Sequence, residues 1–255
     1  MSLGESRAPG LFGGIQAMLA RKGRRAWELS VVEKIQLAPR FIRVRFEGTD
    51  LDELVWRRGQ DLVLELPFEG TIVCRHYTIR DHDSRARTLD VDFVLHGESP
   101  AGDWARAARH GDRIVGAGPR GRTVLEFDAD WHLFMGDETA MPAIFAMLEG
   151  LPPGVRAVAL LEIESEADKL PFETCDGINL KWVLRFGPPK GAGTPLLAAL
   201  DALTLPDGTV HAYTIGETHM VRALRHRLIE RGVDKRHIAA EGYWRPGRVG
   251  GHDHV

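Results

Sequence analysis

The sequence predicts two domains in series: a six-stranded antiparallel β-barrel, followed by an α/β domain built on a parallel sheet. From Trp27 to Phe127, apolar and polar residues mostly alternate with a period of two, as in strands that bury one face. After Asp130, strand-like runs alternate with helical patterns, which is typical of a parallel sheet covered on both faces. The chain of 255 residues is long enough for two cores without disulfide or metal support. We therefore expect an N-terminal extension over 1–26, the barrel over 27–129 and the α/β domain over 130–255.

The barrel strands are predicted where apolar residues share one face. Residues 41–46 place Ile42, Val44 and Phe46 on one face and two arginines on the other, and residues 89–95 alternate in a similar way. Further strands are predicted over 61–66, 74–80, 113–117 and 123–127. About six strands is usual for a small closed antiparallel sheet. One helix, over 103–109, interrupts them.

The α/β domain shows fewer but clearer signals. Strands are predicted over 133–135, 155–161, 182–184 and 210–215. One helix is predicted over 141–149, with Pro142 in its first turn, where a missing N–H costs little. A second helix is predicted over 218–231, with Val221, Leu224, Leu228 and Ile229 on one apolar stripe.

Composition excludes several classes of protein. Apolar residues make up 44% of the chain and charged residues 27%, so a disordered or fibrous protein is excluded. The formal charge of -3 argues against a nucleic-acid partner. The two cysteines, Cys74 and Cys175, suit neither a disulfide framework nor an iron–sulfur cluster. The apolar stretch 11–20 is too short to span a bilayer and its basic cluster follows it, so we expect a short helix or leader, no membrane insertion and a cytoplasmic monomer.

A glycine-rich run, IVGAGPRG over 114–121, matches the dinucleotide-binding pattern. Such a loop holds a pyrophosphate only where a helix follows it, and residues 123–127 read as another strand. We therefore interpret the run as a barrel strand that ends in a glycine-proline turn.

A second motif, Arg75-His76-Tyr77-Thr78, lies on a predicted barrel strand. A flavin needs an aromatic or flat apolar surface for its ring, hydroxyl or amide donors for the ring heteroatoms and a cation for its phosphates. Arg75 and Tyr77 share one face of the strand, so this one element can contact both phosphate and ring. Four residues of this kind, taken alone, more often form an ordinary exposed strand.

Residues downstream favour the flavin interpretation. His96 and Gly97 precede Pro100, Ala101, Gly102 and Trp104 at the predicted helix start. Free N–H groups in the first turn would give a diphosphate a second anchor, and the glycines would allow close backbone approach. The alternative is a capped helix that links two barrel strands.

These residues resemble the siderophore-interacting proteins, which are flavin-dependent ferric-siderophore reductases related to ferredoxin reductases. Besides the two motifs above, the resemblance includes Ala105, GPRG at 118–121, GDETAMPAI at 136–144 and GYWRPG at 242–247, and it covers nearly the whole chain. It implies a six-stranded FAD-binding barrel, a second domain that receives NADH or NADPH, and FAD bound mainly at the first two motifs. Because the flavin carries the chemistry, no catalytic side chain and no metal site is expected.

The segment 136–144 follows the first strand of the predicted parallel sheet, where ligands of such sheets bind. We therefore expect Thr139 to reach the flavin or the nicotinamide. The adjacent Asp137 and Glu138 are interpreted as helix caps and dipole partners, without a role in proton transfer.

The resemblance places Gly216 and Glu217 on the nicotinamide side, between a strand and a helix. Many family members have Trp-x-Ala-Gly-Glu-Ala here, whereas residues 213–218 of this chain read YTIGET. The dinucleotide contacts are therefore left open.

A further departure concerns the substrate. Members commonly carry His-Val-Lys on the strand before Arg-x-Tyr-Thr, with the lysine helping to bind an anionic siderophore; the matching residues here are Leu62-Val63-Leu64. We expect Arg120, Arg122 and Arg245 to hold a ferric siderophore instead, the alternative being that they are solvated surface charges. The other functions left open are an FAD-dependent NAD(P)H reductase with a non-iron acceptor, which Leu64 favours, and a non-catalytic siderophore-binding protein. The closing residues 251–254, Gly-His-Asp-His, are interpreted as a polar tail, the alternative being a metal-binding segment.

Overall fold

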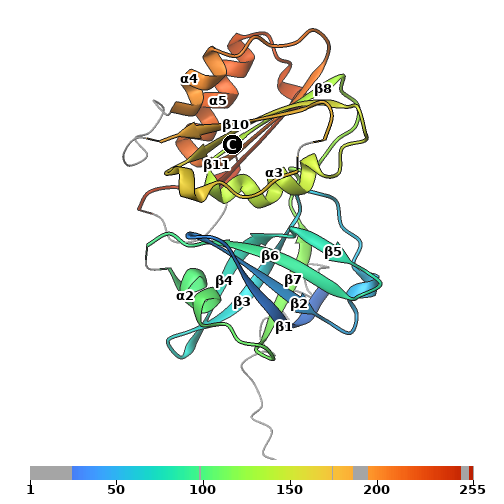
Figure 1. The fold of residues 1–255 in the computed structure, drawn as a ribbon, viewed down its shortest axis with the longest axis vertical. Helices are drawn as coiled ribbons and strands as arrows, with labels where there is room; N and C mark the ends of the chain where they lie inside the picture. Colours follow the sequence, from blue (N-terminus) through green and yellow to red (C-terminus); the bar gives the residue numbers. More distant parts are fainter. Residues whose placement is uncertain (1–24, 98, 174, 186–194, 248–252, 255) are drawn as a thin grey trace, which may run out of the picture.

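The computed structural model describes residues 25–97, 99–173, 175–185, 195–247 and 253–254, and its strands form two sheets (Figure 1). The first is a curled antiparallel sheet with strand order β4-β3-β7-β1-β2-β6-β5, and the second is a mostly parallel sheet with order β10-β9-β8-β11-β12-β13. The predicted leader over 11–20 lies outside the described residues. The two sheets confirm a β domain followed by an α/β domain, while the domain boundaries stay a prediction.

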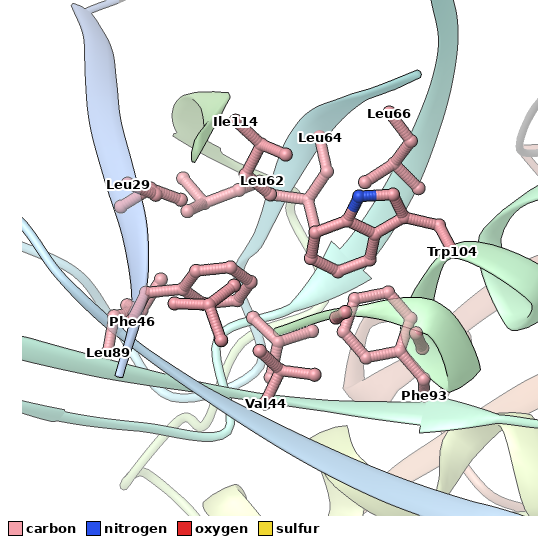
Figure 2. Packing of buried hydrophobic residues seen from close by; sticks show 14 of the residues in the cluster. Leu29, Val44, Phe46, Leu62, Leu64, Leu66, Leu89, Phe93, Trp104 and Ile114 are labelled. Carbon is pink, nitrogen blue, oxygen red and sulfur yellow. The ribbon is translucent and has the colours of Figure 1, made fainter. Parts of the chain in front are cut away.

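The first sheet is built from segments that alternate inward and outward. Its elements are β1 (Arg25–Ala38), β2 (Phe41–Glu47), η1 (Leu51–Glu53), β3 (Asp61–Phe68), β4 (Thr71–Thr78), β5 (Asp81–Asp83), β6 (Thr88–Val94), α2 (Pro100–Ala107) and β7 (Arg113–Arg120). Leu62, Leu64 and Leu66 of β3 point into one core with Val44 and Phe93, as Figure 2 shows. The odd-numbered residues of β3 therefore lie on the outer face.

Two details of the barrel prediction are wrong. The described part of the first sheet has seven strands, because it includes two that were not predicted, β1 and the short β5 that pairs with β6, and the sheet order leaves β4 and β5 as its edges. The backbone N–H of Arg80 donates to the carbonyl of Asp90 (2.9 Å), which joins the end of β4 to β6 and curls the sheet into a half-barrel. Residues 123–127 form no strand.

The rejection of a dinucleotide-binding loop is confirmed, whereas the expected glycine-proline turn is wrong, because Gly118 and Pro119 lie within β7 and Gly118 pairs with Arg25 of β1. Residues 114–120 lie on β7, and no helix lies between β7 and the next strand, β8. The run is therefore part of the barrel and opens no dinucleotide-binding helix.

The second sheet carries its helices on both faces. Its elements are β8 (Trp131–Gly136), η2 (Glu138–Ala140), α3 (Met141–Leu148), β9 (Arg156–Ile163), η3 (Glu166–Asp168), β10 (Ile178–Leu184), α4 (Pro195–Asp201), β11 (Val210–Glu217), α5 (Thr218–Glu230), η4 (Lys235–His237), β12 (Ile238–Trp244) and β13 (Asp253–His254). Only β13, formed by two residues of the predicted polar tail, pairs antiparallel. No helix in the described ranges has the length and apolar content that a membrane span requires.

Helix α3 lies between the two domains (Figure 1). All eight of its residues are buried, which a helix tolerates only when it is covered on every side. Its cluster includes Phe134 and Ile215 from the parallel sheet and Phe41 and Leu125 from the first half of the chain. The two domains therefore share apolar contacts, and this places the barrel against the carboxyl ends of β8, β11 and β12.

Candidate functional site

The candidate site begins at β4, an edge strand whose one sheet neighbour is β3. The backbone N–H of Ile79 donates to the carbonyl of Gln60 on the β3 side, whereas that of Arg80 points to β6. Because backbone groups alternate along an antiparallel strand, those of His76 and Thr78 point away from β3, to the free edge. These two residues of the motif therefore present main-chain donors and acceptors outside the sheet.

The inner face of β4 carries the aromatic part of the motif. The rings of Tyr77 and Phe93 are 4.3 Å apart, and Trp104 of α2 stands 5.6 Å behind Phe93. Trp104 is only 8% exposed and lies within the core, as Figure 2 shows. Burial raises the pKa of the Tyr77 phenol well above its ordinary value, so this side chain is a neutral, firmly packed aromatic surface.

Arg75 has the properties of an anion-binding residue. It is partly exposed, and its guanidinium donates to the carbonyl of the adjacent Cys74 (2.9 Å). Among the described residues, no carboxylate lies within ion-pair distance of it. Its positive charge is thus available to a phosphate.

The outer face of the same strands holds a cluster that the sequence did not reveal. His76 Nδ1 lies 2.9 Å from Asp61 Oδ2 and 2.9 Å from Nη1 of Arg120, whose Nε lies 3.3 Å from Asp61 Oδ1. Asp61 stands directly opposite Thr78 on β4 and Arg120 on β7. Arg120 is therefore an ion-paired residue, and a lone aspartate at the start of a strand gave no sign of this role.

The expected lysine position needs correction. Leu64 is fully buried in the barrel core, so a side chain there faces no ligand (Figure 2). Val63 lies on the outer face, directly opposite His76, and is partly exposed. On β3, the side chain that a ligand can contact is therefore that of Val63 and not that of Leu64.

The start of α2 offers fewer free donors than expected. Ser99 caps the helix: its hydroxyl accepts from the N–H of Gly102 (3.2 Å) and its carbonyl from that of Asp103 (2.8 Å). Pro100 has no N–H, so Ala101 supplies the first-turn donor that these bonds do not use. His96 and Gly97 are exposed, and Gly97 adopts a φ of 53° that favours glycine.

In the α/β domain, Asp137 joins the ends of three parallel strands. Its buried carboxylate accepts hydrogen bonds from Thr139 N (2.9 Å), Thr139 Oγ1 (2.5 Å), Glu217 N (2.8 Å) and Trp244 Nε1 (2.9 Å). Burial raises the pKa of this carboxyl, while the donors oppose that rise. A side chain at Gly216 would collide with Asp137, because a Cβ there would lie 2.6 Å from the carboxylate. Asp137 is thus a structural cap, as predicted, and Thr139 is held beside it.

The other acidic residues of this region are also occupied. Glu217 caps α5 by accepting from the N–H of Met220 (2.8 Å), and its second oxygen lies 2.8 Å from His219 Nδ1. Glu138 pairs with Arg185 (2.6 Å) and with Arg40 of the barrel (3.0 Å), and these arginines keep its pKa low despite burial. Neither carboxylate is set up for proton transfer.

The end of β12 connects the two halves of the site. Tyr243 is hydrogen-bonded to the side chain of Thr78 on β4, and the next residue, Trp244, donates to Asp137. Through these two neighbouring residues, β12 links Thr78 of the barrel to Asp137, which in turn holds Thr139 and adjoins Gly216. Arg245 follows directly and is partly exposed, whereas Arg122 is exposed beyond β7.

The residues of β4 fit a flavin. A flavin needs three things: an aromatic surface for its isoalloxazine ring, a cation for its diphosphate, and hydrogen-bonding groups for the ring heteroatoms. Strand β4 supplies them as Tyr77, as Arg75 and as the main-chain groups on its outer edge. All three occur on one strand, next to the carboxyl ends of a parallel sheet, where ligands bind.

Comparison with known proteins agrees with this geometry. Residues 129–247 match the family model described as siderophore-interacting protein, and residues 58–123 match the siderophore-interacting FAD-binding domain. The chain is 36% identical to the ferric vibriobactin reductase ViuB of Vibrio cholerae, over 86% of this chain and 89% of that protein. It is 28% identical to the NADPH-dependent ferric-chelate reductase of Escherichia coli, over 64% of this chain and 63% of that protein.

A solved structure shows the same architecture. The siderophore utilization protein from T. fusca aligns over 89% of this chain and 95% of its own, with a TM-score of 0.80 and 31% identity. The chain belongs to the siderophore-interacting protein family, and its barrel includes that family's FAD-binding domain.

Proposed function

We propose that this protein is a flavin-dependent oxidoreductase that reduces ferric iron held in a siderophore, with NADH or NADPH as the electron donor. The single observation that carries the proposal is the edge strand β4, where Arg75 and Tyr77 share one face and Thr78 is hydrogen-bonded to Tyr243 at the end of the parallel sheet. The reductase names of the Vibrio cholerae and Escherichia coli relatives support the same chemistry.

In this proposal the barrel residues hold FAD. Arg75 binds the diphosphate, Tyr77 supports the ring, and Thr78 offers main-chain groups at the edge of β4, with His76 two residues before it on the same edge. Ala101 adds one N–H from the first turn of α2, after a turn formed by His96 and Gly97. Because Trp104 lies in the core, it supports Tyr77 through Phe93, while Pro100 and Gly102 shape the helix start.

When bound, FAD supplies the conversion of a two-electron hydride transfer from nicotinamide into single-electron transfers to ferric iron. The protein's own residues bind FAD and the nicotinamide and orient them relative to each other. Thr139, Gly216 and Glu217 form the nicotinamide side, where the four bonds to Asp137 fix the loop after β8 relative to β11 and β12. No side chain is assigned a proton.

The acceptor is proposed to approach from the outer face, which carries Arg120, and to be held also by Arg122, which follows β7, and by Arg245, which follows β12. Arg120 acts there as a pair with Asp61, and Arg122 adds an exposed positive charge. We further propose that the protein works in the cytoplasm, where both nicotinamides are available, and as a monomer.

The test is an anaerobic redox cycle. Purified protein should carry FAD; NADPH or NADH should bleach its absorbance, and an added ferric siderophore should restore the absorbance while a ferrous chelator traps the iron. Bleached protein that ferric siderophores leave reduced would contradict the proposal.

One observation favours a second candidate, an FAD-dependent NAD(P)H reductase with a quinone, dye or protein acceptor. Strand β3, Asp61–Phe68, contains no lysine or arginine to hold an anionic chelate. Restoration of absorbance by a quinone, with ferric complexes inert, would select this candidate.

A further inference from the structure

We propose that Asp61 and Val63 make this site select ferric complexes with little or no net charge, such as hexadentate ferric hydroxamates, over anionic ferric triscatecholates. This inference rests on the proposed function and adds the class of chelator. It is carried by the residues on the outer face of β3, β4 and β7.

We call this surface the acceptor wall; it consists of the partly exposed Val63, His76 and Arg120 together with the buried residues beside them on the same face, Asp61 and Ala117. Val63 stands opposite His76 on β4 and Ala117 on β7, and Asp61 stands opposite Arg120. Val63, His76 and Arg120 are partly exposed, so a ligand can reach them.

The wall adjoins the proposed flavin position. His76 belongs to it through its side chain and to the free edge of β4 through its backbone. Thr78, two residues further on, lies opposite Asp61 and contacts Tyr243 of β12. An acceptor that approaches the ring from the outer face therefore contacts the acceptor wall.

The charges of the wall are balanced internally. Arg120 Nε lies 3.3 Å from Asp61 Oδ1, and its Nη1 lies 2.9 Å and 3.1 Å from the two ring nitrogens of His76. Asp61 is only 5% exposed, so solvent screens its negative charge poorly. The neighbouring Val63 and Ala117 are apolar. Arg122, two residues beyond Arg120, is exposed and therefore well screened.

Chelator chemistry then decides the preference. Three hydroxamates each carry one negative charge and neutralise ferric iron, whereas three catecholates each carry two and leave a trianion. The wall combines an apolar surface with an arginine whose charge Asp61 already neutralises, so it accepts the neutral complex and offers the trianion no unpaired cation to compensate for its lost hydration.

The test measures binding apart from electron transfer. Gallium(III) complexes of a trihydroxamate and of a triscatecholate are inert to reduction, and each is titrated into the FAD-loaded full-length protein. We expect the wild type to bind the trihydroxamate complex at least ~10-fold more tightly.

Two variants and one control test the residues. Asp61→Asn removes the negative charge, and Val63→Lys adds a positive one at a partly exposed position; each should shift the affinity ratio ~10-fold or more toward the triscatecholate. Glu33→Gln, on β1 with a side chain 51% exposed, removes a charge outside the wall and should leave the ratio unchanged.

A wild type that prefers the triscatecholate would overturn the inference, and so would variants that shift the ratio no more than Glu33→Gln does. Ferric complexes, tested in parallel, separate the two proposals. If the gallium preference holds but neither ferric complex reoxidises the flavin, charge selection stands and the reductase function fails.

Discussion

At the scale of single residues, the chemistry depends on which charges are balanced. Arg75 is a cation that no described carboxylate pairs, whereas Arg120 is paired with Asp61. The two arginines differ little in sequence context but differ in role, because an unpaired guanidinium keeps its full attraction for a phosphate.

Changing Arg75 to Ala should raise the dissociation constant for FAD by ~10–100-fold, since a charge-assisted bond contributes about 1.5–3 kcal/mol. The melting temperature should stay near that of the wild type, because Arg75 contributes little to the core. Titration of the apoprotein with FAD measures the affinity. Arg113→Ala, at a side chain 76% exposed on β7, is the control; an equal loss of affinity there would remove the assigned role.

A second residue-scale prediction concerns His132, which is 1% exposed and stacks near Phe134 and Tyr213. Burial lowers the pKa of His132 to about 4, with His211 adding a smaller effect. The unfolded chain therefore binds a proton at higher pH than the folded chain does. The contribution of neutral His132 to the free energy of unfolding should be fully present above pH ~6.5. It should be lost as the pH falls from ~6.5 to ~4, and this loss should be at most about 3 kcal/mol.

Urea unfolding across this pH range measures the effect. His132→Phe should flatten the decline, whereas His226→Gln, at a side chain 77% exposed, should leave it as in the wild type. A decline equally steep in His132→Phe would show that other groups cause it.

At the scale of elements, Asp137 is the point where β8, β11 and β12 are tied together. Changing Asp137 to Asn would turn one acceptor oxygen into a donor that faces other donors. We expect a loss of about 1–3 kcal/mol in the free energy of unfolding and a changed near-ultraviolet signal from Trp244. Asp234→Asn, the exposed cap of η4, should change neither; a silent Asp137→Asn would contradict the role of this carboxylate.

Elements were predictable from sequence where one face is apolar, as in Phe41–Glu47 and Thr88–Val94. Residues 123–127 alternate too, but the described chain offers them no partner strand. Strand β12 was missed because Ile238–Trp244 contains a short apolar run interrupted by a glutamate and a glycine.

The candidate site was predictable only in part, because it is assembled across strands. The motif on β4 was visible as four consecutive residues, whereas Asp61 meets Arg120 only through the pairing of β3 with β7. Strict alternation of Leu62, Leu64 and Leu66 could have shown that Leu64 faces the core.

At the scale of the whole molecule, the two domains are joined by charge as well as by α3. Arg40, in the turn between β1 and β2, donates to both oxygens of Asp168 (2.9 Å each) and to Glu138 (3.0 Å), and it also contacts Glu164. Asp168 and Glu138 are buried, so these bonds are little screened. They fix the loop that carries Thr139 relative to the barrel.

Changing Arg40 to Ala should therefore cost about 3 kcal/mol of stability, as breaking a buried ion pair does. It should also slow reduction of the flavin by NADPH or NADH more than reduction by dithionite, which needs no domain alignment. Arg45→Ala is the control, because it breaks an ion pair with Asp90 that joins two strands of the first sheet and does not connect the two domains. Equal slowing of both reductants in Arg40→Ala would contradict a role in alignment.

The central claim is that the free edge of β4 holds the flavin, and amide hydrogen exchange with and without FAD tests it most directly. The two edges of the first sheet, β4 and β5, provide an internal comparison in one experiment. The account predicts that FAD slows exchange at His76 and Thr78 while β5 is unaffected. Protection confined to β5, or absent from β4 at saturating FAD, would contradict it.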